Sequence, residues 1–252
     1  MLYFFIQYKT ITFALFFSET LGSNTMAKKK QTSDVSMEGV EGALTRTEQF
    51  IEDNQKWIVR IITGILALVV IFIGAKRFYL NPLEEEAHGQ MFVAEQYFEV
   101  DSFNLALYGD GNYSGFLQII DDYGITKAGN LSKYYAGISF LKLGEFEDAI
   151  DYLQKFKSKD KMVAPIATGA IGDAFIELGE NEKGLNHYLK AASLSDNNFT
   201  TPMFLMKAGQ IFENLGDNKK ALDIYEQIRK DYPDYSRRNN IDKYITRSRI
   251  SS

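Results

Sequence analysis

The sequence predicts an all-α protein, in which a single N-terminal transmembrane helix is followed by an α-solenoid of helix hairpins. Three observations lead to this fold class. Fifteen residues between Arg60 and Lys76 carry no charge, and a phrase of small residues, aromatics and glycines recurs at spacings of 35 and 37 residues. Repeats of this length are typical of stacked helix pairs. The chain of 252 residues has only 4 prolines, and proline is disfavoured inside helices.

The composition argues against several classes of site and partner. The chain has no cysteine, which rules out disulfides, thiolate metal sites and a cysteine nucleophile. Its 2 histidines are 99 positions apart, so we predict neither a metal site nor a cofactor. Residues 1–82 carry 9 basic and 7 acidic side chains, and residues 83–252 carry 19 and 26, which together give the net charge of −5. An acidic balance of this kind argues against a nucleic-acid partner.

Residues 1–25 contain two short apolar stretches but lack the order of a secretory signal. The only basic residue, Lys9, interrupts the apolar stretch, and no small-residue cleavage pattern follows Phe17. The next residue, Met26, precedes an alanine and three lysines, as the start of a cytoplasmic tail would. We interpret residues 1–25 as an upstream extension from a misassigned start codon; the alternative is a cleaved signal or a second anchor.

The next segment, residues 26–56, is predicted to be a cytoplasmic tail. Residues 31–49 are polar and rich in small side chains, which favours a flexible segment. A short amphipathic helix is expected around Thr47–Trp57.

Residues 57–79 are predicted to cross a lipid bilayer. The uncharged run Ile61–Ala75 alone would cover about 22 Å, less than a hydrocarbon core of roughly 30 Å. The flanking residues supply the remaining length, because long basic side chains reach the headgroups and aromatic rings prefer the interface. The predicted membrane-interface residues are Trp57, Arg60, Lys76, Arg77 and Tyr79.

The basic residues on the two sides of this segment predict its orientation. Two basic residues lie close to it on the C-terminal side, Lys76 and Arg77, and six lie on the N-terminal side: Lys28, Lys29, Lys30, Arg46, Lys56 and Arg60. Because basic residues favour the cytoplasmic side, the N-terminus is expected in the cytoplasm and the chain after Pro82 outside the membrane. A helix is expected to start after Pro82, with Glu84–Glu86 in its first turn.

A repeated phrase organises the remainder of the chain. A small residue pair is followed after three residues by an aromatic, after four more by a glycine, and after five more by a small residue. The three copies are Ala136-Gly137, Phe140, Gly144 and Ala149; Ile171-Gly172, Phe175, Gly179 and Gly184; and Ala208-Gly209, Phe212, Gly216 and Ala221. A degenerate earlier copy is expected to end its first helix at Gly111 and to begin its second at Tyr113.

Each position of the phrase has a physical role in a helix hairpin. Gly137, Gly172 and Gly209 remove side-chain bulk where the two helices meet, and the aromatics fill the space beyond. The later glycines follow a leucine and can adopt the left-handed conformation that ends a helix. A hairpin cannot bury its own apolar face, so neighbouring hairpins are expected to stack. The last stretch, Ser236–Arg247, has the pattern of a polar capping helix.

This phrase resembles the tetratricopeptide repeat, a helix–turn–helix unit of about 34 residues. The resemblance implies a repeat domain over residues 83–235, with clear repeats at about 130–163, 165–198 and 202–235, and a capping helix and tail at 236–252. The chain departs from the family pattern in two repeats. Near the start of the first helix of each, a bulky residue is replaced, by Lys133 in one and by Thr168 in the other. Only the third copy keeps the closing proline, Pro233.

The family resemblance also implies a partner-binding groove lined by the first helix of each repeat. The candidate groove residues are Leu131, Tyr134, Ile138, Leu141, Ile166, Asp173, Met203, Met206 and Gln210. The lysine and asparagine clamp with which cytosolic co-chaperones hold a peptide carboxylate is absent from these positions. Apolar side chains here suit weak contacts with unfolded or helical segments, and methionine adapts to varied shapes. The alternative for each residue is packing against an adjacent helix.

Enzyme signals are weak, and we predict no catalytic residue. The turn Gly109–Asn112 is rich in glycine, but no strand precedes it and no lysine follows as in a phosphate-binding loop. The acidic pairs, such as Asp121-Asp122, fit solvated helix faces.

The layout as a whole resembles the bacterial ancillary SecYEG translocon subunit family, whose members carry such repeats into the periplasm. The resemblance implies a single-pass protein of the inner membrane, in contact with the lipid bilayer. Its implied partners are translocon subunits, a membrane-anchored periplasmic chaperone and emerging polypeptides. One alternative is a scaffold subunit of another envelope secretion or motility complex. Another topology would keep the repeats in the cytoplasm.

Overall fold

The computed structural model describes residues 37–250. The interpretations of residues 1–25, and the lysines Lys28–Lys30 used for the predicted orientation, lie outside this range. Every regular element within the described residues is a helix, so the predicted all-α solenoid is confirmed. The chain divides into two compact units between Leu66 and Ala67.

The first described element is α2, a helix of 39 residues from Met37 to Ala75. It differs from the predicted short helix around Thr47–Trp57, because helical backbone continues through the preceding polar residues and on into the apolar run. No proline occurs between Met37 and Ala75, so nothing in this stretch removes a backbone donor.

The predicted new helix at Pro82 is instead the continuation of α2. A π-helical turn, η2 (Lys76–Leu80), joins α2 directly to α3 (Asn81–Glu99), and the N–H of Asn81 donates to the carbonyl of Lys76. A proline inside a regular α-helix would clash with the carbonyl four residues earlier. The wider turn before Pro82 is the kind of irregularity that accommodates such a residue.

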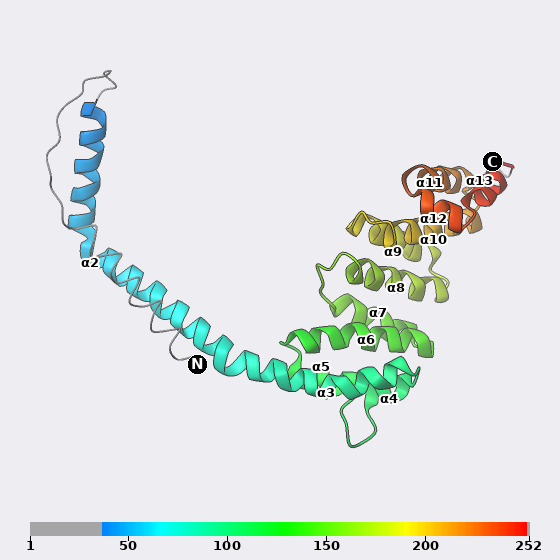
Figure 1. Cartoon of the computed structure of the whole chain (residues 1–252), viewed down its shortest axis with the longest axis horizontal. Helices are drawn as coiled ribbons and strands as arrows, with labels where there is room; N and C mark the ends of the chain where they lie inside the picture. The colour runs from blue at the N-terminus through cyan, green and yellow to red at the C-terminus, as the bar shows by residue number, and fades with distance from the viewer. Residues whose placement is uncertain (1–36, 251–252) are drawn as a thin grey trace. The chain divides into compact units, whose positions relative to one another are not determined.

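The remaining helices form an array of antiparallel hairpins, which Figure 1 shows stacked from α3 to α13. The first pairs are α4 (Phe103–Tyr108) with α5 (Phe116–Tyr123), and α6 (Lys127–Leu143) with α7 (Phe146–Lys155). The next are α8 (Val163–Glu177) with α9 (Asn181–Leu194), and α10 (Thr200–Asn214) with α11 (Asn218–Asp231). The array ends with α12 (Pro233–Arg238) and α13 (Ile241–Ile250).

The glycines of the repeated phrase behave as predicted. The turn glycines Gly144, Gly179 and Gly216 have φ angles of 82°, 77° and 78°, a conformation that favours glycine. The packing glycine Gly209 lies so close to the second helix that an added Cβ would be 2.5 Å from the Tyr225 ring. At Gly172 the corresponding distance to the Tyr188 ring is 2.8 Å. The small residues therefore let the helices of each hairpin approach closely.

The degenerate first copy has different boundaries from those predicted. Its helix α4 ends at Tyr108, before Gly109, and α5 begins at Phe116 rather than Tyr113. Asp110 holds the intervening loop, because its carboxylate accepts from the backbone N–H groups of Asn112 at 2.9 Å and Tyr113 at 2.8 Å. The ring of Phe116 is fully buried, so it takes part in the core at the place of the usual small residue.

The C-terminal helix α13 closes the array, as a capping helix does. Ile241 and Ile245 are buried against α11, with Tyr225 and Ile228 in the same apolar cluster. On the outer side, the Arg247 guanidinium pairs with Glu213 at the end of α10, and the Ser248 hydroxyl donates to the same carboxylate at 2.9 Å. Apolar burial and these polar contacts together hold the last helix on the third hairpin.

Candidate functional site

The candidate groove residues all lie on the first helices of the three clear hairpins, α6, α8 and α10, but the structure gives them unequal access to solvent. Tyr134 and Ile138 pack partly buried around Leu153 and Ile171. Leu131 is partly buried in the N-terminal core, and Met203 in the C-terminal core.

Met206 was predicted to line the groove but is only 8% exposed, because it packs in the core around α10. Ile166 and Gln210 keep part of their surface accessible. Among the predicted residues, Leu141 and Asp173 line the same cavity.

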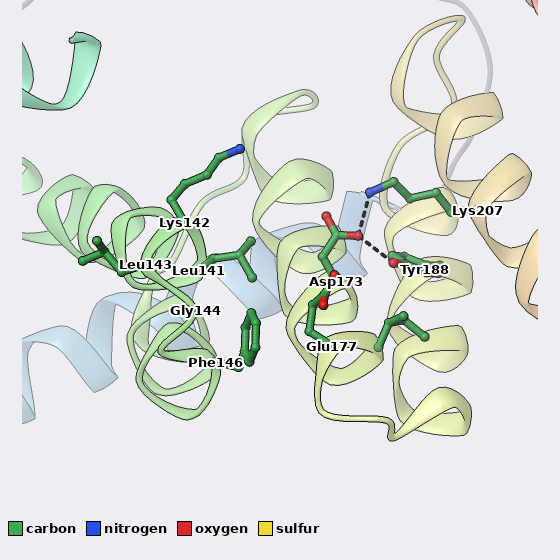
Figure 2. A pocket seen from close by; sticks show the side chains of 10 residues that line it. Leu141, Lys142, Leu143, Gly144, Phe146, Asp173, Glu177, Tyr188 and Lys207 are labelled. Carbon is green, nitrogen blue, oxygen red and sulfur yellow. Dashed lines mark hydrogen bonds and ion pairs between the residues drawn. The ribbon is translucent and has the colours of Figure 1, made fainter. Parts of the chain in front are cut away.

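This cavity has a volume of about 570 Å³ and is open to solvent. Its apolar wall comes from the end of α6 and the start of α7, where Leu141 and Phe146 lie. Its polar wall comes from α8, α9 and α10, with Asp173, Tyr188 and Lys207. In Figure 2, Leu141 and Phe146 lie on one side of Asp173, and Tyr188 and Lys207 lie on the other. The remaining lining residues are Lys142, Leu143, Gly144, Ile176 and Glu177.

Asp173 is the centre of the polar wall. Its Oδ1 accepts from Lys207 Nζ at 2.6 Å and from the Tyr188 hydroxyl at 2.6 Å, as the dashed lines in Figure 2 show. Burial raises the pKa of Tyr188, and the hydrogen bond to Asp173 raises it further. Tyr188 is therefore a neutral donor at physiological pH.

The Lys207 ammonium adds aromatic contacts to this ion pair. Its Nζ lies 5.4 Å from the ring centre of Tyr188 and 5.9 Å from that of Phe204, within the range of cation–π attraction. Phe204 in turn occupies the space beside Gly169 on α8, where any larger side chain would collide with its ring. The second and third hairpins are thus joined by one ion pair and one inserted aromatic.

Lys207 and Tyr188 were not among the predicted groove residues. One sequence signal points to Lys207: it lies 34 positions after Asp173, about one repeat length, and has the opposite charge. Tyr188 is the aromatic that follows Gly184 in the second copy, and nothing in the sequence indicates that its hydroxyl reaches Asp173.

The chemistry of the cavity suits a peptide segment. Leu141, Phe146 and Ile176 can cover an apolar side chain, while Lys142 and Glu177 present opposite charges at the rim. Within residues 37–250, no group of three or more histidine, aspartate or glutamate side chains is placed to hold a metal ion.

The apolar helix is a second candidate region. One helix in the described part of the chain is long and apolar enough to cross a membrane, and none of the other described residues covers its most apolar stretch. The aromatic residues at its ends, Trp57 and Tyr79, are 66% and 62% exposed. The basic residues Arg60, Lys76 and Arg77 are also exposed.

Two of the hairpins match a known repeat family in sequence. A family model described as tetratricopeptide repeat matches residues 132–160 and 204–235, which correspond to the α6–α7 and α10–α11 hairpins. These two hairpins match the tetratricopeptide repeat.

One similar sequence belongs to a much longer protein, and the similar solved structures have low sequence identity to this chain. Over 139 residues, 54% of this chain, the sequence is 30% identical to a tetratricopeptide-repeat-containing protein of Methanocaldococcus jannaschii. The match covers 24% of that protein, so the chain spans about a quarter of its relative's length. Two structures of a Podosopora anserina protein, described as a kinesin light chain with nearly identical tetratricopeptide-like repeats, align over 67% of this chain and 95% of their own. Their identity is 10% and the TM-score is 0.48.

Proposed function

We propose that this protein is a membrane-tethered receptor for polypeptide segments, which it holds in the groove of its tetratricopeptide repeats and does not chemically transform. The cavity around Asp173 is the observation that carries the proposal. It combines an apolar wall with charged side chains on the first helices of the three hairpins. Such a surface matches a peptide better than a small metabolite, because it is open and shallow.

The tether in this proposal is the apolar stretch of α2. Its large side chains, including Leu68, Phe72 and Ile73, are between 58% and 68% exposed. An apolar surface of this extent is costly in water and favourable in a bilayer. The count of basic residues supports an N-terminus in the cytoplasm and repeats on the periplasmic side of a bacterial inner membrane.

For the partner, we propose an ancillary role at the protein translocon, with translocon subunits, a membrane-anchored chaperone and emerging chains as the proteins bound. The support is the layout of tail, single span and outward repeats, together with the adaptable apolar wall of the groove. A scaffold subunit of another envelope machine is the second candidate, since the same layout would serve it.

Site-specific photocrosslinking in native membranes tests this function. A photoreactive residue at Lys142, exposed at the cavity, is expected to capture a translocon subunit, a chaperone or an emerging chain. The same probe at Lys190, exposed on α9 and outside the cavity lining, is the control. Equal capture at both positions, or none at Lys142, would contradict the proposal. A stable complex that lacks translocon components would favour the scaffold.

A substitution in the polar wall provides a second test by the same crosslinking experiment. Asp173→Ala removes the ion pair with Lys207, whose two side chains are 34% and 37% exposed. A pair this exposed contributes about 1 kcal/mol or less to stability. The Tyr188 hydroxyl also loses its acceptor, which adds about 1–3 kcal/mol, and circular dichroism of the variant checks that the array stays folded. In a folded variant, a loss of crosslinking from Lys142 would report on the groove itself.

A further inference from the structure

A basic surface lies on the part of the repeat array next to the apolar helix. Four lysines and one exposed isoleucine line a cavity of about 610 Å³ there, between the α5–α6 turn and the start of the α7–α8 loop. The lysines are Lys127, Lys133, Lys155 and Lys157, and the apolar residue is Ile125, which is 68% exposed. We call these five residues the basic end surface. No acidic side chain is among the residues that line this cavity.

The basic end surface is held together by contacts distant in sequence. The Asn130 side chain on α6 donates to the carbonyl of Lys157 at 2.8 Å and accepts from its N–H at 3.1 Å. The Thr126 hydroxyl accepts from the N–H of Gly129 at 2.9 Å and so begins α6 directly after Ile125. These contacts bring Lys157 beside lysines that lie more than twenty residues earlier in the chain.

The charges of this surface are mostly uncompensated. Lys155 pairs with Asp151 at 2.5 Å. Across residues 37–250, no ion pair joins the ammonium groups of Lys127, Lys133 or Lys157 to an acidic side chain. The nearby Glu84 carboxylate binds backbone groups at the start of α6 and not a lysine ammonium. It accepts from the N–H groups of Lys127 at 2.7 Å and Ala128 at 3.1 Å.

The position of this surface relative to the end of the apolar stretch is defined by a second cavity. This cavity of about 310 Å³ is lined by Ile125 and Lys127 on one side and by Phe72, Lys76 and Leu80 on the other. The contact of Glu84 with the start of α6 fixes the two sides together. Ile125 and Lys127 therefore lie beside the residues at which the uncharged run ends.

We propose that the basic end surface docks on anionic phospholipid headgroups of the leaflet in which the apolar helix ends. The proposal rests on the membrane anchoring proposed above, which places Lys76 at headgroup level. Lysines in this position are attracted to an anionic surface, and an exposed isoleucine can enter the boundary between headgroups and acyl chains. Since residues 83–252 carry a balance of −7, an anionic bilayer repels most of the array and attracts this end of it.

The test uses the full chain reconstituted into vesicles, with an environment-sensitive fluorophore at Ile125→Cys. The chain has no native cysteine, so the label is specific. Vesicles of phosphatidylcholine are compared with an equimolar mixture of phosphatidylcholine and phosphatidylglycerol. We expect a blue shift and quenching by spin-labelled lipid in the mixture, both lost at about 0.5 M salt because screening then acts over a few ångströms. A label at Ile250→Cys, 82% exposed at the end of the array, should not respond to lipid composition.

Charge-reversal variants with the same change in net charge complete the design. The triple variant Lys127→Glu, Lys133→Glu and Lys157→Glu should reduce the lipid quenching by about fivefold or more. The triple variant Lys190→Glu, Lys219→Glu and Lys230→Glu changes exposed lysines on α9 and α11 and should leave it unchanged. Equal responses in the two lipid mixtures, or equal effects of the two triple variants, would overturn the proposal. An unresponsive label would also overturn it and would favour an acidic protein as the partner of this surface.

Resistance of the reconstituted chain to alkaline extraction separates the two levels of inference. A chain that stays in the vesicles but does not respond at Ile125 contradicts the docking surface alone. A chain that is extracted contradicts the membrane anchoring, and the docking proposal fails with it.

Discussion

Gly209 shows how a missing side chain determines the distance between two helices. It lies on α10 opposite Tyr225 of α11, which is fully buried in the C-terminal core. The Tyr225 hydroxyl also donates to Glu213 at 3.1 Å, so both ends of this ring are held. The ring cannot move away from an added methyl group without losing packing or a hydrogen bond.

We expect Gly209→Ala to destabilise the array by about 1–3 kcal/mol, because the new Cβ would meet the Tyr225 ring at 2.5 Å. Gly89→Ala on α3 is the matched control, since nothing lies within 4 Å of the added atom. In an exposed helix interior alanine is favoured over glycine by about 0.5–1 kcal/mol, so the control should stabilise. Urea unfolding in detergent, followed by circular dichroism, measures both. Equal midpoints would contradict the packing argument.

Glu213 is the acidic residue that joins the capping helix to the third hairpin. Burial alone would raise its pKa, but hydrogen bonds from Arg247, Ser248 and Tyr225 outweigh burial, and the pKa lies below its usual value. The ionised carboxylate is thus the form that the folded state stabilises.

A lowered pKa in the folded state gives a definite pH dependence. The stabilisation by Glu213 is present above the ordinary glutamate pKa of 4.5, which holds in the unfolded chain, and it is lost as the pH falls through the lower pKa of the folded state. Glu213→Gln should therefore be less stable at neutral pH and show a smaller loss below about pH 4.5. Thermal unfolding across the acid range measures the effect. Glu147→Gln, exposed on α7, is the control and should keep the native pH profile.

At the scale of elements, each hairpin is completed by its neighbour. Phe204 of α10 packs beside Gly169 of α8, and Lys207 pairs with Asp173 across the same boundary. The last hairpin has no further repeat to complete it, so α13 takes that place with Ile241 and Ile245. The apolar face of α11 would otherwise be exposed, which is why an array of this kind needs a capping helix.

The capping role predicts a clear contrast between two isoleucines of α13. Ile245 is 2% exposed and Ile250 is 82% exposed. Ile245→Ala should cost about 2–5 kcal/mol, as buried large-to-small changes do, and Ile250→Ala should cost nearly nothing. Limited proteolysis of the C-terminal hairpin reads out the difference. Equal sensitivity of the two variants would show that α13 does not close the array.

At the scale of the whole molecule, the proposed anchoring places the apolar stretch of α2 in the bilayer and the repeat array in water. The exposed apolar stretch of α2 and the acidic repeat region have opposite solvent preferences, and the basic end surface lies where they meet. The groove around Asp173 shares the α6–α7 hairpin with the basic end surface but none of its lining residues, so lipid docking and partner binding would use separate surfaces.

Protease access tests the proposed topology. With the repeats on the periplasmic side, protease added to intact spheroplasts should remove the array after Pro82, and an N-terminal epitope should be protected until lysis. A cytoplasmic marker protein is the control for spheroplast integrity. An array that survives until the membrane is broken would place the repeats in the cytoplasm.

Local signals explain why much of the fold was predictable. The glycines at 144, 179 and 216 each end a helix through their own backbone conformation, and the packing glycines recur at the repeat length. The signal failed in the first copy, where the side chain of Asp110 builds the loop and α5 starts later than predicted. It also failed at Pro82, where a π-turn allows the helix to continue.

The sequence by itself determined the all-α class, the three helix hairpins and the apolar helix, because turn residues and hydrophobic periodicity act over a few neighbouring positions. Only the tertiary structure decided that Asp173 meets Lys207, that Met206 is buried, and that Lys127 lies beside the end of the apolar helix. These contacts depend on how successive hairpins pack, and the register of that packing arises from many side chains at once.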